Sequence, residues 1–325
     1  MKPAPFDYVR PRRLDEALDH LADHGADARV LAGGQSLVPL LNLRTVRPKV
    51  LVDVNGVAEL DYVRVTADAV EVGALTRQRR LELDPRVTAR LPLLADALPL
   101  IGRIATRNRG TVGGSLAHAD PAAELPSVAV ACGAELSIAS ANGSRVVDAE
   151  RFFVAAYRTV LDPGELVTGV RFPVPSSRTG QAWVEYGRRY ADRPVAGVAC
   201  ALTLSAAPVV EGPVVEGPVA EGAVIEDAVI EDAVLVCAGV GDRPLRPPAV
   251  ERLIGARPSA AAFSEVARAA AEWSTADGYR RRLVHGLALR ALDRALRRAA
   301  GEAAARSVER PVEGSVERQD DRDVA

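Results

Sequence analysis

The sequence predicts an α+β fold, and three observations support this prediction. Strand-like and helix-like segments alternate around a glycine-rich turn in the first 55 residues. Residues 60–175 continue as a mixture of both, and the last third changes to antiparallel strands followed by two helices. Such a change in the order of elements indicates more than one packed layer. The 325 residues are enough for two or three domains of roughly 100–200 residues each.

Hydrophobic spacing places the elements of the first half. Leu14, Leu18 and Leu21 recur at the spacing of one helix face. Around this helix we expect strands at 6–9, 28–31 and 50–54 and a short helix at 37–43. In the mixed region we expect strands at 70–72, 136–139 and 167–172 and helices at 76–83 and 121–131. Pro173 and Pro175 then mark a boundary.

The last third is expected to form one antiparallel sheet, with strands at 183–186, 198–204 and 234–238 and helices at 260–273 and 279–300. Two segments of low complexity interrupt or follow this pattern. An acidic five-residue repeat at 211–235 predicts an extended, mobile excursion whose last repeat leads into the strand at 234. The charge-rich residues 301–325 predict a disordered tail.

Composition excludes several classes of function. With 41 basic and 43 acidic residues the net charge is −2, which argues against nucleic acid or an anionic membrane as partner. No segment approaches the roughly 18 apolar residues of a membrane span. The N-terminal residues lack a hydrophobic signal core, so we expect a cytoplasmic protein.

The three cysteines, Cys132, Cys200 and Cys237, lie far apart with no Cys-x-x-Cys motif. This spacing disfavours a disulfide scaffold, a zinc site or an iron–sulfur cluster, and we expect no metal site. The two lysines, Lys2 and Lys49, belong to no phosphate-loop motif. Any demanding chemistry is therefore expected to come from a bound cofactor.

Two glycine-rich segments are the candidates for binding it. Residues 31–37 read LAGGQSL between a strand and a helix, and residues 110–116 read GTVGGSL. Glycines let the backbone approach a ligand closely, and N–H groups at a helix start can bind a phosphate. The alternative is that each Gly-Gly pair only marks a tight turn.

The residues after the second segment extend the candidate site. Asp120 precedes Pro121, a pattern that also predicts a simple helix cap. Glu124 follows one turn later, where its carboxylate could accept hydrogen bonds from ribityl or ribose hydroxyls. His118 could donate a proton near a cofactor, although ordering of its loop is the alternative.

At these residues the sequence resembles a known family. AGGQSLVPLLNLR (32–44) and RNRGTVGGSLAHADPAAELP (107–126) are similar to the two flavin-binding signatures of the medium, FAD-binding subunit of molybdenum hydroxylases. That family includes carbon monoxide dehydrogenase, xanthine dehydrogenase and aldehyde oxidoreductases. DPGELVTGVRFPVP (162–175) and YRRRLVHGLALRALDRAL (279–296) continue the resemblance.

The resemblance implies a two-lobed FAD-binding domain of the PCMH type at 1–175, with lobes of about 1–56 and 57–175. A smaller domain of antiparallel strands and helices follows at 180–300. It also implies FAD as the cofactor. The cofactor-binding residues expected on this basis, together with the glycine segments, are Leu31, Ala32, Gly33, Gly34, Gln35, Ser36, Ile101, Gly102, Thr111, Val112, Gly113, Gly114, Ser115, Asp120, Glu124 and Leu166.

Within that set the resemblance implies different contacts. The two glycine segments would hold the pyrophosphate and the neighbouring ribityl chain, while Ile101, Gly102 and the backbone of Leu166 would lie beside the flavin ring. Glu124 stands where relatives commonly have Asp. Arg193 stands where several relatives place an aromatic or aliphatic residue over the flavin, and it could instead face a negatively charged group.

The implied function is electron transfer. An iron–sulfur small subunit and a molybdopterin large subunit are the expected partners, and FAD would pass electrons to a terminal acceptor, which is NAD, a quinone or oxygen. No side chain is expected to be catalytic. Two alternatives remain: a stand-alone FAD-dependent oxidoreductase acting on a small molecule, and a non-catalytic assembly subunit.

Overall fold

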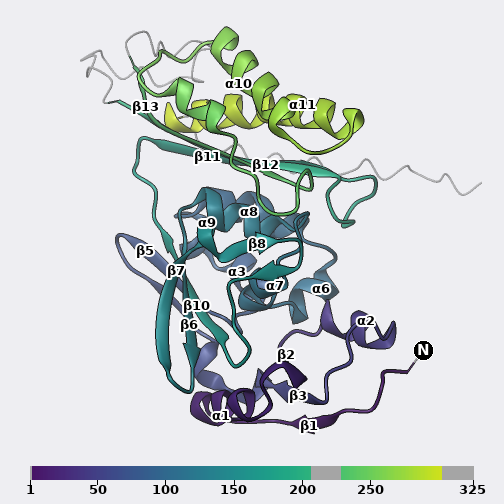
Figure 1. Cartoon of the computed structure of the whole chain (residues 1–325). Helices are drawn as coiled ribbons and strands as arrows, with labels where there is room; N and C mark the ends of the chain where they lie inside the picture. The colour runs from purple at the N-terminus through teal and green to yellow at the C-terminus, as the bar shows by residue number, and fades with distance from the viewer. Residues whose placement is uncertain (1, 206–227, 302–325) are drawn as a thin grey trace, which may run out of the picture.

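The computed structural model describes residues 2–205 and 228–301. The chain is built in three parts, stacked one on another (Figure 1). Strands β1–β3 with α1 and α2 form one end, a second sheet with most of the helices forms the middle, and strands β11–β13 with α10 and α11 form the other end. Mixed sheet and helix in this arrangement confirm the predicted α+β fold.

The first part is a small parallel sheet, with strand order β1–β3–β2. Its elements are β1 (Asp7–Val9), α1 (Leu14–His24), β2 (Ala28–Leu31), α2 (Leu37–Asn42) and β3 (Val50–Asp53). Helix α1 buries Ala17, Leu18 and Leu21 in the same apolar cluster as Val50 and Val52 of β3. Because β2 and β3 are parallel and pair Leu31 with Asp53, the segments after them leave the sheet at the same edge.

The second sheet is antiparallel, with the order β4–β5–β10–β6–β7. Its strands are β4 (Val63–Val65), β5 (Ala69–Gly73), β6 (Glu135–Ser140), β7 (Gly143–Asp148) and β10 (Leu166–Pro173). Strand β10 lies in the middle and pairs with β5 on one side and β6 on the other. Alternating residues of these strands, such as Val70, Leu136, Ile138 and Phe172, are fully buried against the helices.

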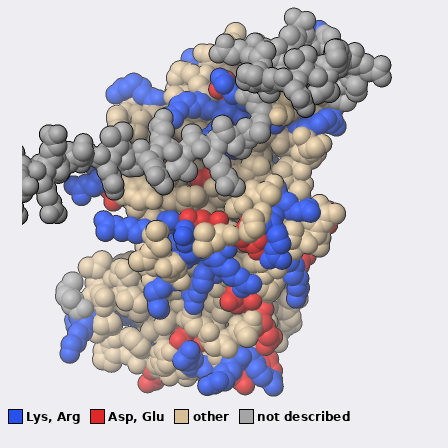
Figure 2. All heavy atoms as spheres, turned by 180° about the vertical axis from the view of Figure 1, so that it is seen from behind, with Lys and Arg blue, Asp and Glu red and all other residues tan. Residues whose placement is uncertain are grey.

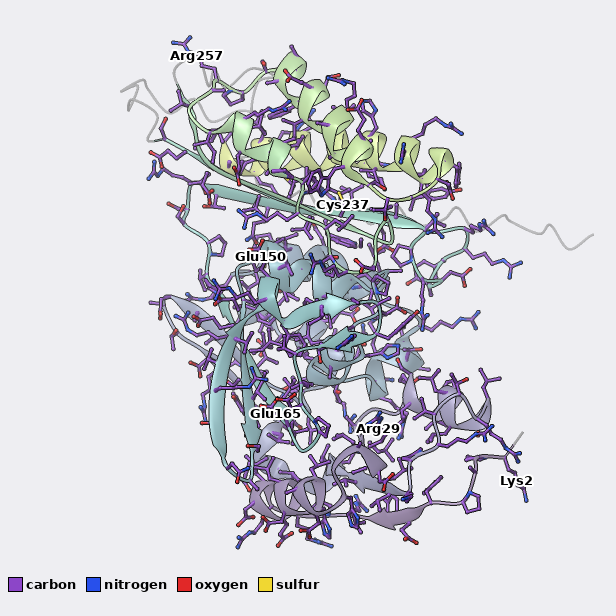
Figure 3. The ribbon with its side chains drawn as sticks, in the orientation of Figure 1. Lys2, Arg29, Glu150, Glu165, Cys237 and Arg257 are labelled. Atoms are coloured by element: carbon purple, nitrogen blue, oxygen red, sulfur yellow. The ribbon has the colours of Figure 1, made fainter. Side chains whose placement is uncertain are left out.

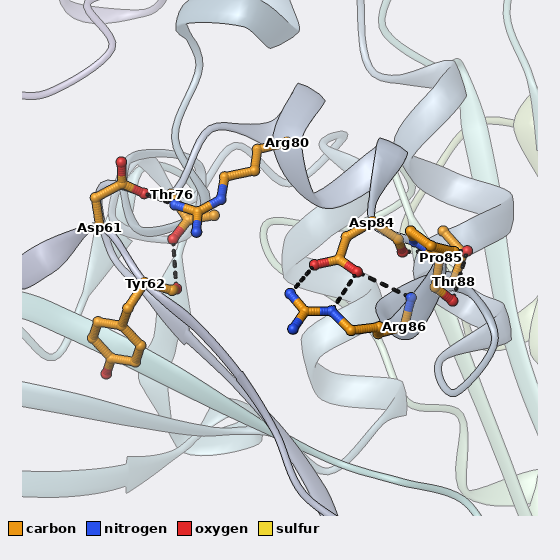
Figure 4. A network of polar contacts seen from close by, with 8 residues as sticks. All are labelled: Asp61, Tyr62, Thr76, Arg80, Asp84, Pro85, Arg86 and Thr88. Carbon is orange, nitrogen blue, oxygen red and sulfur yellow. Dashed lines mark hydrogen bonds and ion pairs between the residues drawn. The ribbon is translucent and has the colours of Figure 1, made fainter.

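Short helices pack on this second sheet: α3 (Gln78–Leu83), α4 (Pro85–Thr88), α5 (Pro92–Ala97), α6 (Ile104–Arg109), α7 (Val112–His118), α8 (Glu124–Ala131) and α9 (Ala149–Phe152). Strands β8 (Phe153–Ala155) and β9 (Arg158–Thr159) form a separate hairpin. At the joint between α3 and α4, Asp84 accepts the backbone N–H of Arg86 at 3.0 Å (Figure 4). Arg80 of α3 pairs with Asp61, which precedes β4, at 2.7 Å.

The third part is an antiparallel sheet of β11 (Thr179–Tyr186), β12 (Ala196–Leu204) and β13 (Ile230–Ala238), covered on one face by α10 (Ala260–Trp273) and α11 (Gly278–Ala299). Helices α10 and α11 bury their apolar residues with Val198, Cys200 and Leu202 of β12. The opposite face of the sheet, with Trp183 and Ala199, belongs to the same apolar cluster as α5 and α8.

Polar contacts also join the third part to the middle one. The Asp96 carboxylate of α5 accepts two hydrogen bonds from the Arg298 guanidinium of α11, at 2.7 and 3.0 Å, and a third from the backbone N–H of Trp183 at 3.1 Å. These contacts hold β11 between α5 and α11. On the face seen from behind, basic and acidic side chains are interspersed (Figure 2).

Several element boundaries differ from the predictions. Strand β13 begins at Ile230, so the last acidic repeat is paired strand and does not merely lead into it. The preceding repeats at 211–227 and the predicted tail after 301 lie outside the described residues. Helix α8 begins at Glu124, not at residue 121, and helix α7 was not predicted at all. The sheets fall on either side of the predicted boundary at 175, but the domain limits stay predictions.

Candidate functional site

The first glycine segment, residues 32–36, forms the loop between β2 and α2. The side chain of Asn55, which follows β3 at the same sheet edge, donates to the carbonyl oxygens of Ala32 at 2.8 Å and Leu31 at 3.4 Å. Asp53 fixes Asn55 in turn by accepting its backbone N–H at 3.0 Å. Burial alone would raise the pKa of Asp53, but hydrogen bonds from Tyr8 and Asn55 hold it below its ordinary value. The loop is therefore anchored through its carbonyl groups.

The N–H groups of this loop are left unused. Among the described residues, none accepts a hydrogen bond from the backbone N–H of Gly33, Gly34, Gln35 or Ser36. Gly34 has a φ of 74°, a left-handed conformation that glycine adopts without strain. Gly33 is buried, and Gly34 and Ser36 are half-buried. N–H groups in such positions normally find a partner, so this run of free donors fits an oxygen-rich anion. The first segment thus has the donor set that a pyrophosphate requires.

The second glycine segment differs from the prediction. Thr111 is the N-cap of α7, and its hydroxyl oxygen accepts the N–H of Gly114 at 3.1 Å. The N–H of Val112 donates to Thr76 at 3.0 Å, and the N–H of Gly113 donates to Ala74 at 2.9 Å. The prediction of a second cradle of free backbone N–H groups is therefore wrong, because the N–H groups of Val112, Gly113 and Gly114 already donate to acceptors within this chain.

Two hydroxyl groups of the second segment can still face a ligand. The Thr111 oxygen accepts the Gly114 N–H, which leaves the Thr111 hydroxyl hydrogen free to donate. Ser115 is half-buried, and its hydroxyl bonds to no described residue. The predicted contact of this segment with FAD would therefore be made by these two hydroxyl groups and by the backbone of Gly114, which has no side chain in the way.

The structure brings the two glycine segments together. A Cβ built on Gly33 would clash with the carbonyl oxygen of Arg109 and lie 2.9 Å from the Cα of Gly110. One built on Gly113 would lie 2.8 Å from the Cα of Ala74. Both glycines are thus required for close packing of backbone on backbone. A side chain at either position would therefore disturb this packing, whether or not it also reached a ligand.

Arg77, the N-cap of α3, joins the same segments. Its guanidinium donates to the Arg109 carbonyl oxygen at 2.5 Å and to the Asn55 side-chain oxygen at 2.7 Å. A continuous chain of contacts therefore runs from the first loop through Asn55 and Arg77 to the segment that precedes Thr111. This contact chain fixes the relative position of the two glycine segments.

Ile101 and Gly102 lie before α6, where the buried side chain of Arg107 organises them. One guanidinium nitrogen donates to the carbonyl oxygens of Ile101 at 3.0 Å and Gly102 at 2.8 Å. The rest of the guanidinium pairs with Glu82, at 2.7 and 3.2 Å. Burial would raise the pKa of Glu82, but Arg107 and Arg79 lower it. The side chain of Leu166 is buried in the apolar cluster of the first sheet, and the predicted contact of its backbone with the flavin stays a prediction.

Asp120 and Glu124 lie where the middle part meets the third sheet. Asp120 accepts the backbone N–H of Ala122 at 3.0 Å, and its other oxygen is 2.7 Å from an Arg193 nitrogen. That contact is an ion pair by distance, although the N–H groups are not aligned for a hydrogen bond. Asp120 therefore closes a turn before α8 and does not cap the helix, and Arg193 faces a negative group as the sequence suggested.

Glu124 is buried beside two other carboxyl groups. The residue is 5% exposed, and its carboxyl group accepts a hydrogen bond from its own backbone N–H. Burial, with Glu185 and Asp120 nearby, raises the pKa of Glu124 to about 8. Burial also raises the pKa of Glu185, whose carboxylate accepts the indole N–H of Trp183 at 2.8 Å. Glu124 thus holds a proton at neutral pH.

His118 lies at the end of α7, between this carboxyl cluster and the β8–β9 hairpin. Its ring lies against that of Tyr157, with 5.1 Å between the ring centroids. Burial lowers the pKa of His118, so the imidazole is neutral at neutral pH. The contacts fit the alternative role of ordering the loop.

Sequence reasoning missed four residues of this region: Asn55, Arg77, Arg107 and Glu185. A signal existed for Asn55, because the residues that follow neighbouring parallel strands meet at one sheet edge. Arg107 stands at the start of the signature at 107–126, but that signature gave it no role of its own. Arg77 and Glu185 reach the site from distant elements, and their local sequence carries no motif.

The described part of the chain holds no cluster of three or more histidine, cysteine or acidic residues placed to bind a metal ion. The three cysteines are free thiols, and burial raises the pKa of each. Cys237 lies in the third sheet, beneath the helices (Figure 3). Among the described helices, none is long and apolar enough to cross a membrane.

Comparison with known proteins decides the family. The FAD-binding domain in molybdopterin dehydrogenase matches residues 4–175 of the chain. The chain belongs to this family. The predicted resemblance, and FAD as the cofactor of the family, are thereby confirmed.

Named relatives of this FAD-binding family are subunits of oxidoreductases. The chain is 43% identical, over 63% of its length and 69% of the relative, to the 6-hydroxypseudooxynicotine dehydrogenase complex subunit alpha of Paenarthrobacter nicotinovorans. It is 38% identical, over 64% of its length and 73% of the relative, to the carbon monoxide dehydrogenase medium chain of Hydrogenophaga pseudoflava.

Solved structures extend the similarity beyond residue 175. Carbon monoxide dehydrogenase from Hydrogenophaga pseudoflava matches with a TM-score of 0.82 at 32% identity, covering 92% of this chain and 99% of that one. Quinoline 2-oxidoreductase from Pseudomonas putida 86 matches with a TM-score of 0.78 at 33% identity, covering 93% and 99%. The chain is thus a medium, FAD-binding subunit of the molybdenum hydroxylase type, and the prediction of an oxidoreductase subunit is confirmed.

Proposed function

We propose that this chain binds FAD across its two glycine segments and carries electrons from the iron–sulfur clusters of a partner subunit to a terminal acceptor. The observation that carries the proposal is the run of four free N–H groups at Gly33–Ser36, beside the hydroxyls of Thr111 and Ser115. These donors fit the oxygens of a pyrophosphate. FAD, when bound, supplies the redox chemistry. The described residues include no group of side chains placed to bind a metal ion.

The other residues have binding and positioning roles in this proposal. Arg77 and Asn55 keep the two glycine segments in register, and Arg107 fixes the carbonyl groups of Ile101 and Gly102. Protonated Glu124 is uncharged at neutral pH, so it can both donate and accept a hydrogen bond with a hydroxyl of the cofactor. No side chain acts as a general base on the substrate.

The proposed partners are an iron–sulfur small subunit and a molybdopterin large subunit. Two relatives support this: one is named as a subunit of a dehydrogenase complex and the other as the medium chain of carbon monoxide dehydrogenase. The buried thiols of this chain, whose pKa values are raised, are poor metal ligands, so the clusters are assigned to a partner.

Flavin binding by variants of the full chain tests the proposal. The purified, desalted protein is expected to show the visible spectrum of a flavin, and chromatography should identify the released compound as FAD. Ser115→Ala removes a hydroxyl that bonds to no described residue, and we expect it to weaken FAD binding by about tenfold, as for a lost hydrogen bond to a charged group.

Ser144→Ala, on the exposed strand β7, is the matched control and should bind FAD as the wild type does. A folded wild-type chain that neither retains nor takes up FAD would overturn the proposal. Equal FAD affinity of wild type and Ser115→Ala would remove Ser115 from the site.

A further inference from the structure

A pocket adjoins the carboxyl cluster that Asp120, Glu124 and Glu185 form. It has a volume of about 440 Å³ and opens between the β11–β12 loop and the first turn of α11. Its walls include three arginines, Arg188 and Arg193 from the loop and Arg280 from the helix. Arg193 also pairs with Asp120, so the pocket and the proposed cofactor site share a wall. The two glycine segments lie at the opposite end of α7.

The arginines of this pocket keep donors free. Arg193 places one nitrogen beside Asp120, and Arg280 donates one N–H to the Gly239 carbonyl oxygen at 3.1 Å. Arg188 bonds to no residue in the described part of the chain. A guanidinium carries five N–H donors in a fork that matches phosphate oxygens. Most of these donors therefore point to no protein acceptor.

Two carboxylates also line the pocket and offset part of the positive charge. Asp277 is the N-cap of α11, and its side chain already accepts the backbone N–H of Arg280 at 2.9 Å. Asp192 is exposed on the loop. Asp120, which pairs with Arg193 at 2.7 Å, is a third carboxylate beside the pocket. The three arginines are therefore balanced in charge, and their free N–H donors are what favours a phosphate.

The start of α11 supplies a positive potential to the pocket. The helix runs for 22 residues, and the N–H groups of Gly278 and Tyr279 in its first turn donate to no described acceptor. The N-terminal end of a helix attracts anions. Tyr279, which lines the pocket, is 45% exposed and offers a ring face on which a planar group can stack.

We propose that this pocket binds a nucleotide, with its phosphates on Arg188, Arg193 and Arg280 and its base against Tyr279. The inference rests on the proposed function and deepens it, because the pocket would bring a nucleotide-type electron acceptor to the edge of the flavin site. A quinone or oxygen carries no phosphate and would make no use of the three arginines. The volume is that of a small-molecule site.

Calorimetric titration of the full chain, saturated with FAD, tests this proposal. Saturation removes the glycine segments as a competing phosphate site. The probes are ADP, which cannot be reduced, and inorganic pyrophosphate. We expect one ADP to bind per chain and to bind more tightly than pyrophosphate, because only ADP can use Tyr279.

Arg188→Ala is the decisive variant, since Arg188 bonds to no described residue and its loss should not affect folding. We expect ADP binding to weaken by about tenfold or more, as for a lost charge-assisted contact. The neighbouring Arg189 does not line the pocket, so Arg189→Ala is the matched control and should leave ADP binding within about twofold of the wild type.

Each outcome decides one point. Absence of ADP binding, or an equal loss in Arg188→Ala and Arg189→Ala, would overturn the site. Equal affinities for ADP and pyrophosphate would overturn the nucleotide assignment in favour of phosphate alone. Flavin content, read from the spectrum, keeps the two proposals apart: a chain that holds FAD but no ADP contradicts only this inference, whereas a chain that holds no FAD contradicts the proposed function.

Discussion

Glu124 should make the stability of this protein fall as the pH rises. The carboxyl group has an ordinary pKa of 4.5 in the unfolded chain and about 8 in the folded protein, because it is buried beside Glu185 and Asp120. Between these two values the folded protein holds a proton that the unfolded chain has released. The free energy of unfolding therefore decreases with pH in this range, is unaffected by Glu124 below it, and reaches its full loss above pH 8.

The size of the effect follows from the two pKa values. They differ by about 3.5 pH units, and one unit corresponds to about 1.4 kcal/mol, so the whole loss is about 5 kcal/mol. Between pH 5.5 and 7.5 the slope is about 1.4 kcal/mol per pH unit, or about 3 kcal/mol in total. A loss of this size is a large fraction of the stability of a typical protein.

Urea unfolding of wild type and Glu124→Gln across this pH range measures the slope. Glutamine has the shape of the protonated acid and does not titrate, so the difference in unfolding free energy should grow in favour of the variant as the pH rises. Glu251→Gln, at an exposed position of η5 (Pro248–Leu253), is the matched control and should track the wild type. Parallel pH dependences for wild type and Glu124→Gln would refute the reasoning.

Two further predictions concern packing and the buried ion pair. Gly113→Ala places a methyl group 2.5 Å from the Cβ of Ala74, so it should cost about 1–3 kcal/mol in a thermal or urea melt of the FAD-free chain. Gly286→Ala, on α11 with open space around the new Cβ, should instead gain about 1 kcal/mol, and equal effects of the two changes would contradict the packing argument. Arg107→Leu removes the donor of the Ile101 and Gly102 carbonyl oxygens and leaves Glu82 paired with Arg79, so it should lower the unfolding free energy by about 1–3 kcal/mol. A urea midpoint equal to that of wild type would show that Arg107 does not hold the 101–102 segment.

The two glycine segments were predictable because their signal is local. A Gly-Gly pair followed by small polar residues, between a strand and a helix, needs no knowledge of distant contacts. Whether their N–H groups are free is not local. Ala74 and Thr76, which follow β5, accept the N–H groups of Gly113 and Val112, and nothing near the second segment reveals this pairing. The same motif is therefore a donor loop in one place and a packing contact in the other.

The carboxyl cluster shows a second limit of the sequence. Asp120 before Pro121 reads as a helix cap, but the chain makes a turn there and pairs Asp120 with Arg193 from the third sheet. Such pairs depend on how the parts dock. Strand β7 was also not predicted, but its signal was local: Asn142-Gly143 is a hairpin turn sequence that could have placed it.

Helix α8 has a consequence for how the chain divides. Every residue from Glu124 to Ala131 is buried, and its neighbours include Trp183, Ala199 and Val236 of the third sheet in one continuous apolar cluster. The family match ends at 175, but the hydrophobic interior does not end there. A fragment cut at that point would expose the face of α8 to water, because residues beyond 175 complete the apolar cluster that covers this helix.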